Sequence, residues 1–153
     1  MLYGVNPFID KDVSALNLHP VMTLSAPIIA INQCLKGEKV GYGGTWQAQG
    51  DSHIAVIAIG YGDGYPRHAQ NGTPVLIGDK EYPLVGRVSM DLITVDITGS
   101  SGIQVGDQAI LWGENLSNNK KVVLPVEKVA ECADTIAYEL LCSVYGRAHY
   151  NYN

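Results

Sequence analysis

The segment HIAVIAI at residues 53–59 runs directly into GYGDGYPR at residues 60–67, and this junction decides the fold. The first segment is an apolar run with the length of a buried strand. In the second, three glycines around Tyr61 lack β-carbons and allow unusual backbone angles, and Pro66 fixes the exit. We therefore expect Tyr61 on a rigid turn at a strand end, where its phenol meets a ligand. The alternative is a glycine-rich hairpin turn whose tyrosine only covers an edge of the core.

Other segments with strand character lie on both sides of this junction. Each is rich in β-branched or apolar residues and is bounded by turn-forming residues. Their spacing of roughly 8–12 residues is typical of a closed barrel or a sandwich. Pro27 predicts a break or an edge strand in the first of them, and Gly78 to Lys80 predicts a hairpin loop. The predicted strands are 21–35, 51–59, 74–77, 82–89, 92–97 and 108–112, and residues 40–46 are a segment loosened by glycines.

Helical spacing is confined to the carboxy-terminal part of the chain. Pro125 stands where a first helical turn tolerates proline, and apolar residues follow it at intervals of three and four. A second helix is expected from Thr135 or Ile136 to Val144. The prediction is a mainly β fold, a small closed or partly open β-barrel with one or two helices near the carboxy terminus. Residues 1–153 are expected to form a single domain.

The composition is that of a globular chain with an acidic surface. Of 153 residues, 46% are hydrophobic, and the formal net charge is −5. Neither nucleic acid nor an anionic membrane is expected as a partner, because an acidic surface attracts neither. No apolar stretch approaches the roughly 18 residues that span a bilayer, and the amino terminus lacks a signal-peptide pattern.

The cysteines and histidines also limit the possible functions. The cysteines include no Cys-x-x-Cys pair, which fits a reducing cytoplasm better than a disulfide framework. The histidines are scattered and none has metal-ligand spacing, so no metal site is expected. The residues concerned are Cys34, Cys132, Cys142, His19, His53, His68 and His149.

Two further segments combine glycine with reactive side chains. GYGGTW at residues 41–46 again flanks a tyrosine, Tyr42, with glycines, and GRVSMD at residues 86–91 ends an apolar strand with a cation, a hydroxyl and a carboxylate. Asp91 is expected to pair with Arg87 or with another arginine. Taken singly, that segment also fits a surface salt bridge of little energetic value, and Tyr42 fits a barrel corner.

Together these segments resemble the carboxy-terminal β-domain of the alanine racemase family, pyridoxal-phosphate enzymes that interconvert L- and D-alanine. The matching segments follow the order found in the family and cover nearly the whole chain. They are MLYG at 1–4, VGYGGT at 40–45, GYGDGYPR at 60–67, VGRVSMD at 85–91, VGD at 105–107 and YELLC at 138–142.

The resemblance implies roles for individual residues. Tyr61 matches the catalytic tyrosine, the base that removes the α-proton of L-alanine. Met90 matches the methionine whose backbone contacts the substrate carboxylate. A tyrosine that binds the cofactor phosphate in some members corresponds to Tyr145 or, with a shift of one position, to Gly146. The residues that match supporting positions or the substrate corridor are Arg87, Asp91 and Tyr42.

The resemblance also implies that this chain is an incomplete part of an enzyme. In the family, an amino-terminal (β/α)8 barrel carries the lysine that binds pyridoxal phosphate, and no segment here has the repeated strand–helix pattern of such a barrel. An ordinary phenol has a pKa of about 10 and needs nearby groups to act as a base. We therefore expect the chain to be inactive and without cofactor by itself.

The resemblance also implies that the full enzyme is a head-to-tail homodimer in the cytoplasm. The D-alanine that it makes is used for peptidoglycan. In such a dimer, the tyrosine of one subunit completes the active site in the barrel of the other subunit. Tyr61 and Met90 are therefore expected on an exposed, partly apolar face that tends to self-associate.

Two other functions are considered. The chain could be a non-catalytic β-barrel module whose tyrosines contact a partner or a small ligand. It could instead be the β-domain of a pyridoxal-phosphate amino-acid decarboxylase, but that site needs a cysteine and an acidic residue, which residues 60–67 and 89–91 do not match.

Overall fold

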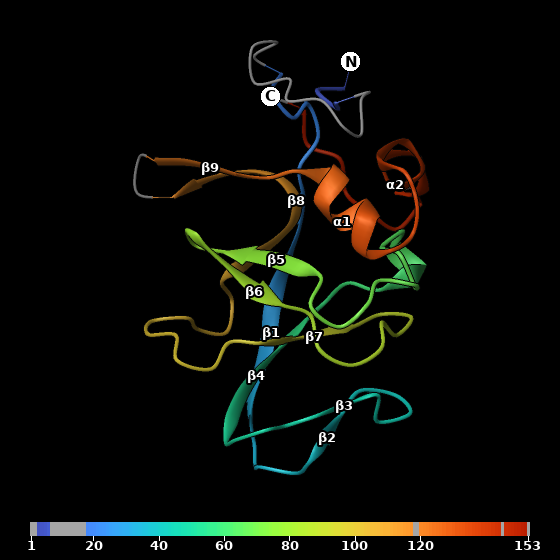
Figure 1. Ribbon diagram of the computed structural model, residues 1–153. Coiled ribbons are helices and arrows are strands. Elements are labelled where there is room, and N and C mark those ends of the chain that lie inside the picture. The colour runs from blue at the N-terminus through green and yellow to red at the C-terminus, as the bar shows by residue number, and fades with distance from the viewer. Residues whose placement is uncertain (1–2, 7–17, 118–119, 145, 153) are drawn as a thin grey trace.

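The computed structural model describes residues 3–6, 18–117, 120–144 and 146–152. The strands are β1 (Leu24–Cys34), β2 (Lys39–Val40), β3 (Trp46–Gln47), β4 (Ser52–Ile57), β5 (Pro74–Ile77), β6 (Lys80–Pro83), β7 (Ile93–Asp96), β8 (Gln108–Ser117) and β9 (Lys120–Leu124). Two short helices follow, α1 (Val126–Cys132) and α2 (Ala137–Ser143), and they lie together beside β8 (Figure 1). None of the helices in the described ranges has the length and apolar character needed to cross a bilayer.

The main sheet has the strand order β6-β5-β8-β1-β4-β7, with β9 paired to β8, and each pairing is antiparallel. The predicted mainly β fold with two helices near the carboxy terminus is therefore confirmed. A barrel is not confirmed, because the described strands leave the sheet open. The chain after β6 meets β7 at the isolated bridge between Leu84 and Val95, where the Val85 N–H donates to the Thr94 carbonyl at 2.9 Å. β2 and β3 form a separate hairpin.

β1 passes through the middle of the sheet and continues through Pro27, so the predicted break or edge strand there is wrong. The strand pairs with β8 from Leu24 to Pro27 and with β4 from Ile28 to Cys34. The two pairings meet at Pro27 and Ile28: the Pro27 carbonyl accepts the Ala58 N–H at 3.1 Å on the β4 side, and the Ile28 N–H donates to Asp107 O at 2.9 Å on the β8 side. A residue that lacks an N–H is tolerated at such a position because no continuous two-sided ladder is interrupted.

Two more sequence predictions differ from the structure. The predicted strand 82–89 is wrong in its bounds, because β6 ends at Pro83 and the following residues turn toward the interior, with Leu84, Val85 and Val88 buried. β8 extends to Ser117 and pairs with β9, which was not predicted. By contrast, β5 has the predicted bounds 74–77, and its hairpin with β6 turns at the predicted position.

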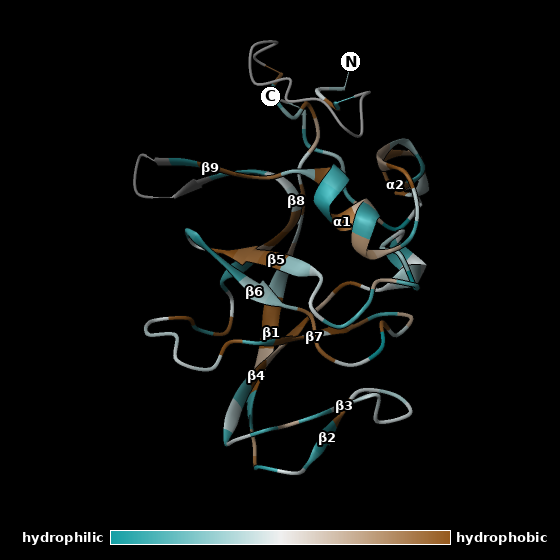
Figure 2. Cartoon of the chain, in the orientation of Figure 1, coloured by the Kyte–Doolittle hydropathy of each residue, from teal (hydrophilic) through white to brown (hydrophobic). Residues whose placement is uncertain are grey.

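The core lies between the sheet and the two helices. Figure 2 shows hydrophobic colour along β1, β5 and β7, and hydrophilic colour on the outer side of α1 and at the far end of β9. The largest fully buried side chains include Trp112 on β8 and Tyr65 of the 60–67 segment, whose rings stack with centroids 6.2 Å apart. This stack anchors the tyrosine-bearing segment to the core.

Candidate functional site

Tyr61 begins a short 3-10 turn, Tyr61–Asp63, just after the chain leaves β4. The Gly60 N–H donates to Asp63 Oδ2 at 3.0 Å, and the Asp63 N–H donates to the Gly60 carbonyl at 3.0 Å. Gly64 ends the turn at a φ of 98°, in the region that favours glycine. The Tyr61 side chain is 44% exposed. Tyr61 therefore stands at the surface on a hydrogen-bonded turn at a strand end.

This turn is joined to the segment that carries Met90. The Tyr61 N–H donates to the Ser89 carbonyl at 3.0 Å, and the Gly62 N–H donates to the Met90 carbonyl at 2.9 Å. The approach is so close that a β-carbon on Gly60 would lie 2.3 Å from Ser89 O and 2.4 Å from Met90 O. The Met90 side chain is 52% exposed. Tyr61 and Met90 thus form one unit at the surface.

The loop that carries Tyr42 contacts the start of the same segment. It lies in the loop of the β2–β3 hairpin and is 81% exposed. A β-carbon on Gly41 would lie 3.0 Å from Gly86 Cα and 2.9 Å from Arg87 N, so the hairpin loop rests directly on the start of the 86–91 segment. It presents Tyr42 outward.

Residues 86–91 thus connect the two tyrosine-bearing loops. In Figure 1 the loop between β2 and β3, the segment before β7 and the 60–67 segment all lie on the right-hand side of the molecule. We call this surface the tyrosine face. It contains the five described candidates from the sequence, Tyr42, Tyr61, Arg87, Met90 and Asp91. Tyr145, the sixth, lies outside the described residues.

Asp91 pairs with an arginine that the sequence reasoning did not single out. Its Oδ1 lies 2.7 Å from Arg147 Nη2, and Asp63 Oδ1 lies 3.1 Å from Arg147 Nε. Of the two pairings expected for Asp91, the one with another arginine is therefore confirmed. Arg147 follows α2 and is 56 positions from Asp91, so no local sequence signal connects them.

Arg67 is the other residue of this surface that was missed. Its guanidinium carbon lies 5.9 Å from the centroid of the Tyr61 ring, a cation–π geometry. The sequence did contain a signal, since Arg67 ends the same GYGDGYPR segment. Arg67 follows Tyr61 by six positions, and the turn at residues 61–63 together with Pro66 brings its side chain back to the Tyr61 ring.

A hollow of about 790 Å³ opens beside Tyr61, between the 60–67 segment and the connection from α1 to α2. Arg67 and His68 line it together with the carboxylates of Asp134 and Glu139. The Ser143 hydroxyl, also in the lining, already donates to the carbonyls of Gly64 and Leu140. The lining residues include no lysine. The hollow therefore offers no amine for the covalent attachment of pyridoxal phosphate, and its two carboxylates outnumber its one guanidinium. No cluster of three or more side chains suited to a metal ion occurs within the described ranges.

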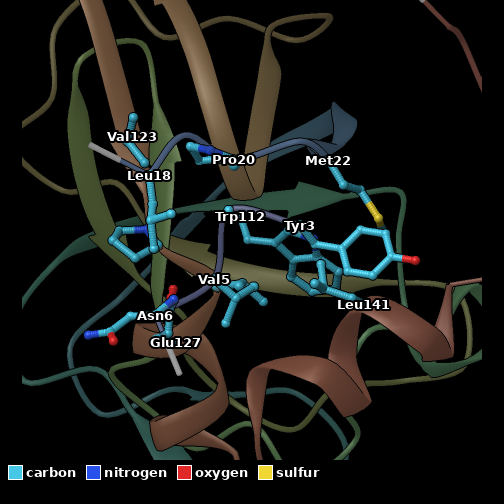
Figure 3. Close-up of a pocket in the computed structure, with 14 residues that line it drawn as sticks. Tyr3, Val5, Asn6, Leu18, Pro20, Met22, Trp112, Val123, Glu127 and Leu141 are labelled. Atoms are coloured by element: carbon cyan, nitrogen blue, oxygen red, sulfur yellow. The ribbon is translucent and has the colours of Figure 1, made fainter. Parts of the chain in front are cut away.

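A second hollow, of about 400 Å³, lies where residues 3–6 and 18–22 cross β8 and α1 (Figure 3). Tyr3, Val5 and Trp112 contribute to its largely apolar lining. Its one carboxylate, Glu127, already accepts a hydrogen bond from the Asn6 N–H at 2.6 Å. This hollow contains none of the candidate residues from the sequence.

Comparison with known proteins shows the family of the chain. Residues 21–152 match the family described as "Alanine racemase, C-terminal domain". The alanine racemase of Vibrio cholerae is 49% identical over 152 residues, which are 99% of this chain and 40% of that protein. The alanine racemase of Coxiella burnetii is 51% identical over 155 residues, with 98% of this chain and 40% of that protein covered.

Solved structures show the same relation. The biosynthetic alanine racemase from Pseudomonas aeruginosa superposes with a TM-score of 0.90 at 41% identity, covering 99% of this chain and 40% of that one. The alanine racemase from Acinetobacter baumannii gives a TM-score of 0.84 at 49% identity, covering 96% of this chain and 39% of that one. The chain thus spans 40% of the length of these curated relatives. It belongs to the family of alanine racemase C-terminal domains.

Proposed function

We propose that this chain supplies one wall of an alanine racemase active site, where L- and D-alanine are interconverted and D-alanine is made for peptidoglycan. In this proposal Tyr61 is the base that removes the α-proton of L-alanine, and the backbone of Met90 meets the substrate carboxylate. One observation carries the proposal. The exposed Tyr61 turn is hydrogen-bonded to the carbonyls of Ser89 and Met90, so a phenol and the Met90 backbone belong to one rigid surface.

The chemistry divides between this chain and the rest of the enzyme. Pyridoxal phosphate, held by the rest of the enzyme, makes the α-proton acidic by withdrawing electrons from the α-carbon. In this chain, the Met90 N–H has no hydrogen-bond partner among the described residues, which leaves it available to a carboxylate. The phenolate oxygen of Tyr61 takes the proton from one face of the α-carbon and becomes a phenol, and Arg67 keeps a positive charge against its ring.

Tyr42 is a second candidate for the base. It is more exposed than Tyr61, at 81% against 44%, and its loop rests on the same 86–91 segment. A phenol held on a backbone turn without bulky neighbours meets the same structural requirement. Tyr61 is the assigned base because its turn is hydrogen-bonded to the carbonyls of Ser89 and Met90, and kinetics tests this choice against Tyr42.

The proposal assigns the rest of the enzyme to the part of the relatives that this chain does not cover. That part would contain the (β/α)8 barrel and its lysine, and a second subunit would bring the tyrosine face onto the barrel in a head-to-tail homodimer. The cysteines Cys34, Cys132 and Cys142 are free thiols, which supports a reducing cytoplasm as the location of this assembly.

The test combines this chain with the part of the Vibrio cholerae relative that it does not cover, in the presence of pyridoxal phosphate. Racemisation and the exchange of the α-proton into deuterated water are then measured from each enantiomer. Tyr61→Phe keeps the ring but removes the proton acceptor, so we expect exchange from L-alanine to fall by about 10²-fold or more. Exchange from D-alanine should fall much less, because the opposite face uses another base.

Tyr42→Phe is the matched control, since it changes a phenol of the same face. We expect it to leave the exchange rate from L-alanine within a few-fold of that of the unchanged chain. The reverse pattern would transfer the base role from Tyr61 to Tyr42. If the combined protein binds the cofactor yet does not racemise alanine, the chain is the non-catalytic binding module considered above.

A further inference from the structure

Arg147 connects two parts of the tyrosine face that are distant in sequence. Its Nε lies 3.1 Å from Asp63 Oδ1, in the Tyr61 turn, and its Nη2 lies 2.7 Å from Asp91 Oδ1, next to Met90. One planar guanidinium therefore holds two carboxylates from two loops. Such a fork cannot be replaced by a lysine, whose ammonium is a single compact charge.

Each of the two carboxylates belongs to a loop that carries a candidate residue and is held by backbone hydrogen bonds. The second oxygen of Asp63 accepts the Gly60 N–H at 3.0 Å, at the start of the turn that carries Tyr61. Asp91 directly follows Met90, whose carbonyl accepts the Gly62 N–H at 2.9 Å. The ion pairs and the backbone bonds thus constrain the same two loops from different directions.

The guanidinium also packs against Gly62. A β-carbon there would lie 2.6 Å from Arg147 Nη1 and 3.0 Å from Met90 O. Arg147 therefore lies directly over the turn. The hydrogen bond to Asp91 and the charge of Asp63 raise the pKa of Arg147 above its ordinary value. It stays charged at every pH at which the enzyme works.

We propose that Arg147 is a positioning residue that holds the Tyr61 turn and the Met90 loop in one fixed arrangement. Exposed ion pairs commonly contribute little to global stability, and Arg147 is about half exposed. Its effect is therefore local, on the relative position of two loops. The catalytic consequence rests on the proposed function, whereas the effect on the loops rests on these contacts alone.

The first experiment follows amide hydrogen exchange in the full chain. Arg147→Met removes the charge and keeps a long apolar side chain. We expect about 10-fold faster exchange or more at the amides of Tyr61 and Gly62, which bond to the Met90 loop, and no change in the core strands β4 and β7. Arg147→Lys should restore part of the protection, because one ammonium reaches only one of the two carboxylates.

Lys121→Met is the matched control. It removes another surface ion pair, Lys121 with Glu114 on the β8–β9 arm, and should not change exchange at Tyr61 or Gly62. Unchanged exchange at these two amides in Arg147→Met overturns the proposal. Faster exchange throughout the core also overturns it, because Arg147 would then be a general structural residue.

The second experiment measures kcat and KM in the combined racemase described above. We expect Arg147→Met to lower kcat by about 10- to 100-fold, since a displacement near 1 Å at an active site has effects of this size. Arg147→Lys should lie between this variant and the unchanged chain. Loosened loops with unchanged kcat would support the effect on the loops and contradict the proposed function of Tyr61 and Met90.

Discussion

At Gly60 and Gly64 the absence of a side chain allows other parts of the protein to lie against the Tyr61 turn. A β-carbon on Gly60 would meet the carbonyls of residues 89–90 at 2.3–2.4 Å, and one on Gly64 would lie 2.4 Å from Ser143 O. The Ser143 hydroxyl also donates to the Gly64 carbonyl at 2.7 Å. These two glycines thus allow the turn to pack closely against α2 on one side and the Met90 loop on the other.

Gly60→Ala tests this packing. Gly60 has an extended backbone, with a φ of −152°, so alanine there is opposed by contact and not by backbone strain. We expect a loss of about 1–3 kcal/mol in the free energy of unfolding, measured by urea denaturation, as for other overpacked sites. Gly50→Ala is the control, because a β-carbon at Gly50 meets nothing within 4 Å. It should change stability by less than about 0.5 kcal/mol, and equal losses for both variants would contradict the argument.

Among the elements, the helices depend most on their surroundings. α1 and α2 have seven residues each, and isolated helices of this length are unstable in water. α1 forms because Val126, Val129 and Ala130 pack one face onto the core, while Glu131 stays exposed. The strands of the main sheet instead gain support from neighbours in the ladder, as β1 does from β8 and β4.

Val129→Ala measures how far α1 depends on this face. Val129 is fully buried, and removing two methyl groups from a packed site should cost about 2–3 kcal/mol of unfolding free energy. Glu131→Ala, on the exposed side of the same helix, should change it by less than about 0.5 kcal/mol. Thermal or urea unfolding followed by circular dichroism gives both values. A loss for Val129→Ala no larger than that for Glu131→Ala would show that α1 does not contribute to the core.

On the scale of the whole molecule, one core connects the sheet, the helices and the tyrosine face. Tyr65 and Trp112 stack at its centre, and both are buried. The Tyr65 hydroxyl and the Trp112 indole N–H have no hydrogen-bond partner among the described residues. Burial raises the pKa of Tyr65 far above its ordinary value, and the proximity of Cys132 adds to this rise. The folded protein therefore keeps the Tyr65 proton at a pH at which the unfolded chain has released it.

Stability should accordingly fall in alkaline solution. Below about pH 10 both states hold the Tyr65 proton, and above it only the folded state does, so the raised pKa lowers the unfolding free energy as the pH increases. Tyr65→Phe removes this dependence, which amounts to at most about 1.4 kcal/mol per pH unit for one proton. It also removes an unpartnered hydroxyl and should not destabilise the protein at pH 7. Urea unfolding from pH 8 to 11 checks both points, and equal slopes for the two proteins would contradict the assignment.

Most of the fold could be predicted from local pattern. The apolar run before Gly60, the hairpin between β5 and β6, and the helix after Pro125 each depend on residues close together in sequence. β9 could not be found in this way, because its support comes from pairing with the extended end of β8. The continuity of β1 through Pro27 likewise depends on a change of partner that the sequence does not display.

The same division holds for the candidate site. The sequence alone determined that tyrosines on glycine-rich turns and the GRVSMD segment belong to an alanine racemase C-terminal domain, because those motifs are contiguous. Only the tertiary structure decided which groups meet: that Arg147, rather than Arg87, pairs with Asp91, and that Tyr42 shares a face with Tyr61. Ion pairs and close backbone contacts between distant segments depend on how the sheet and helices pack. Local residue patterns do not encode these contacts.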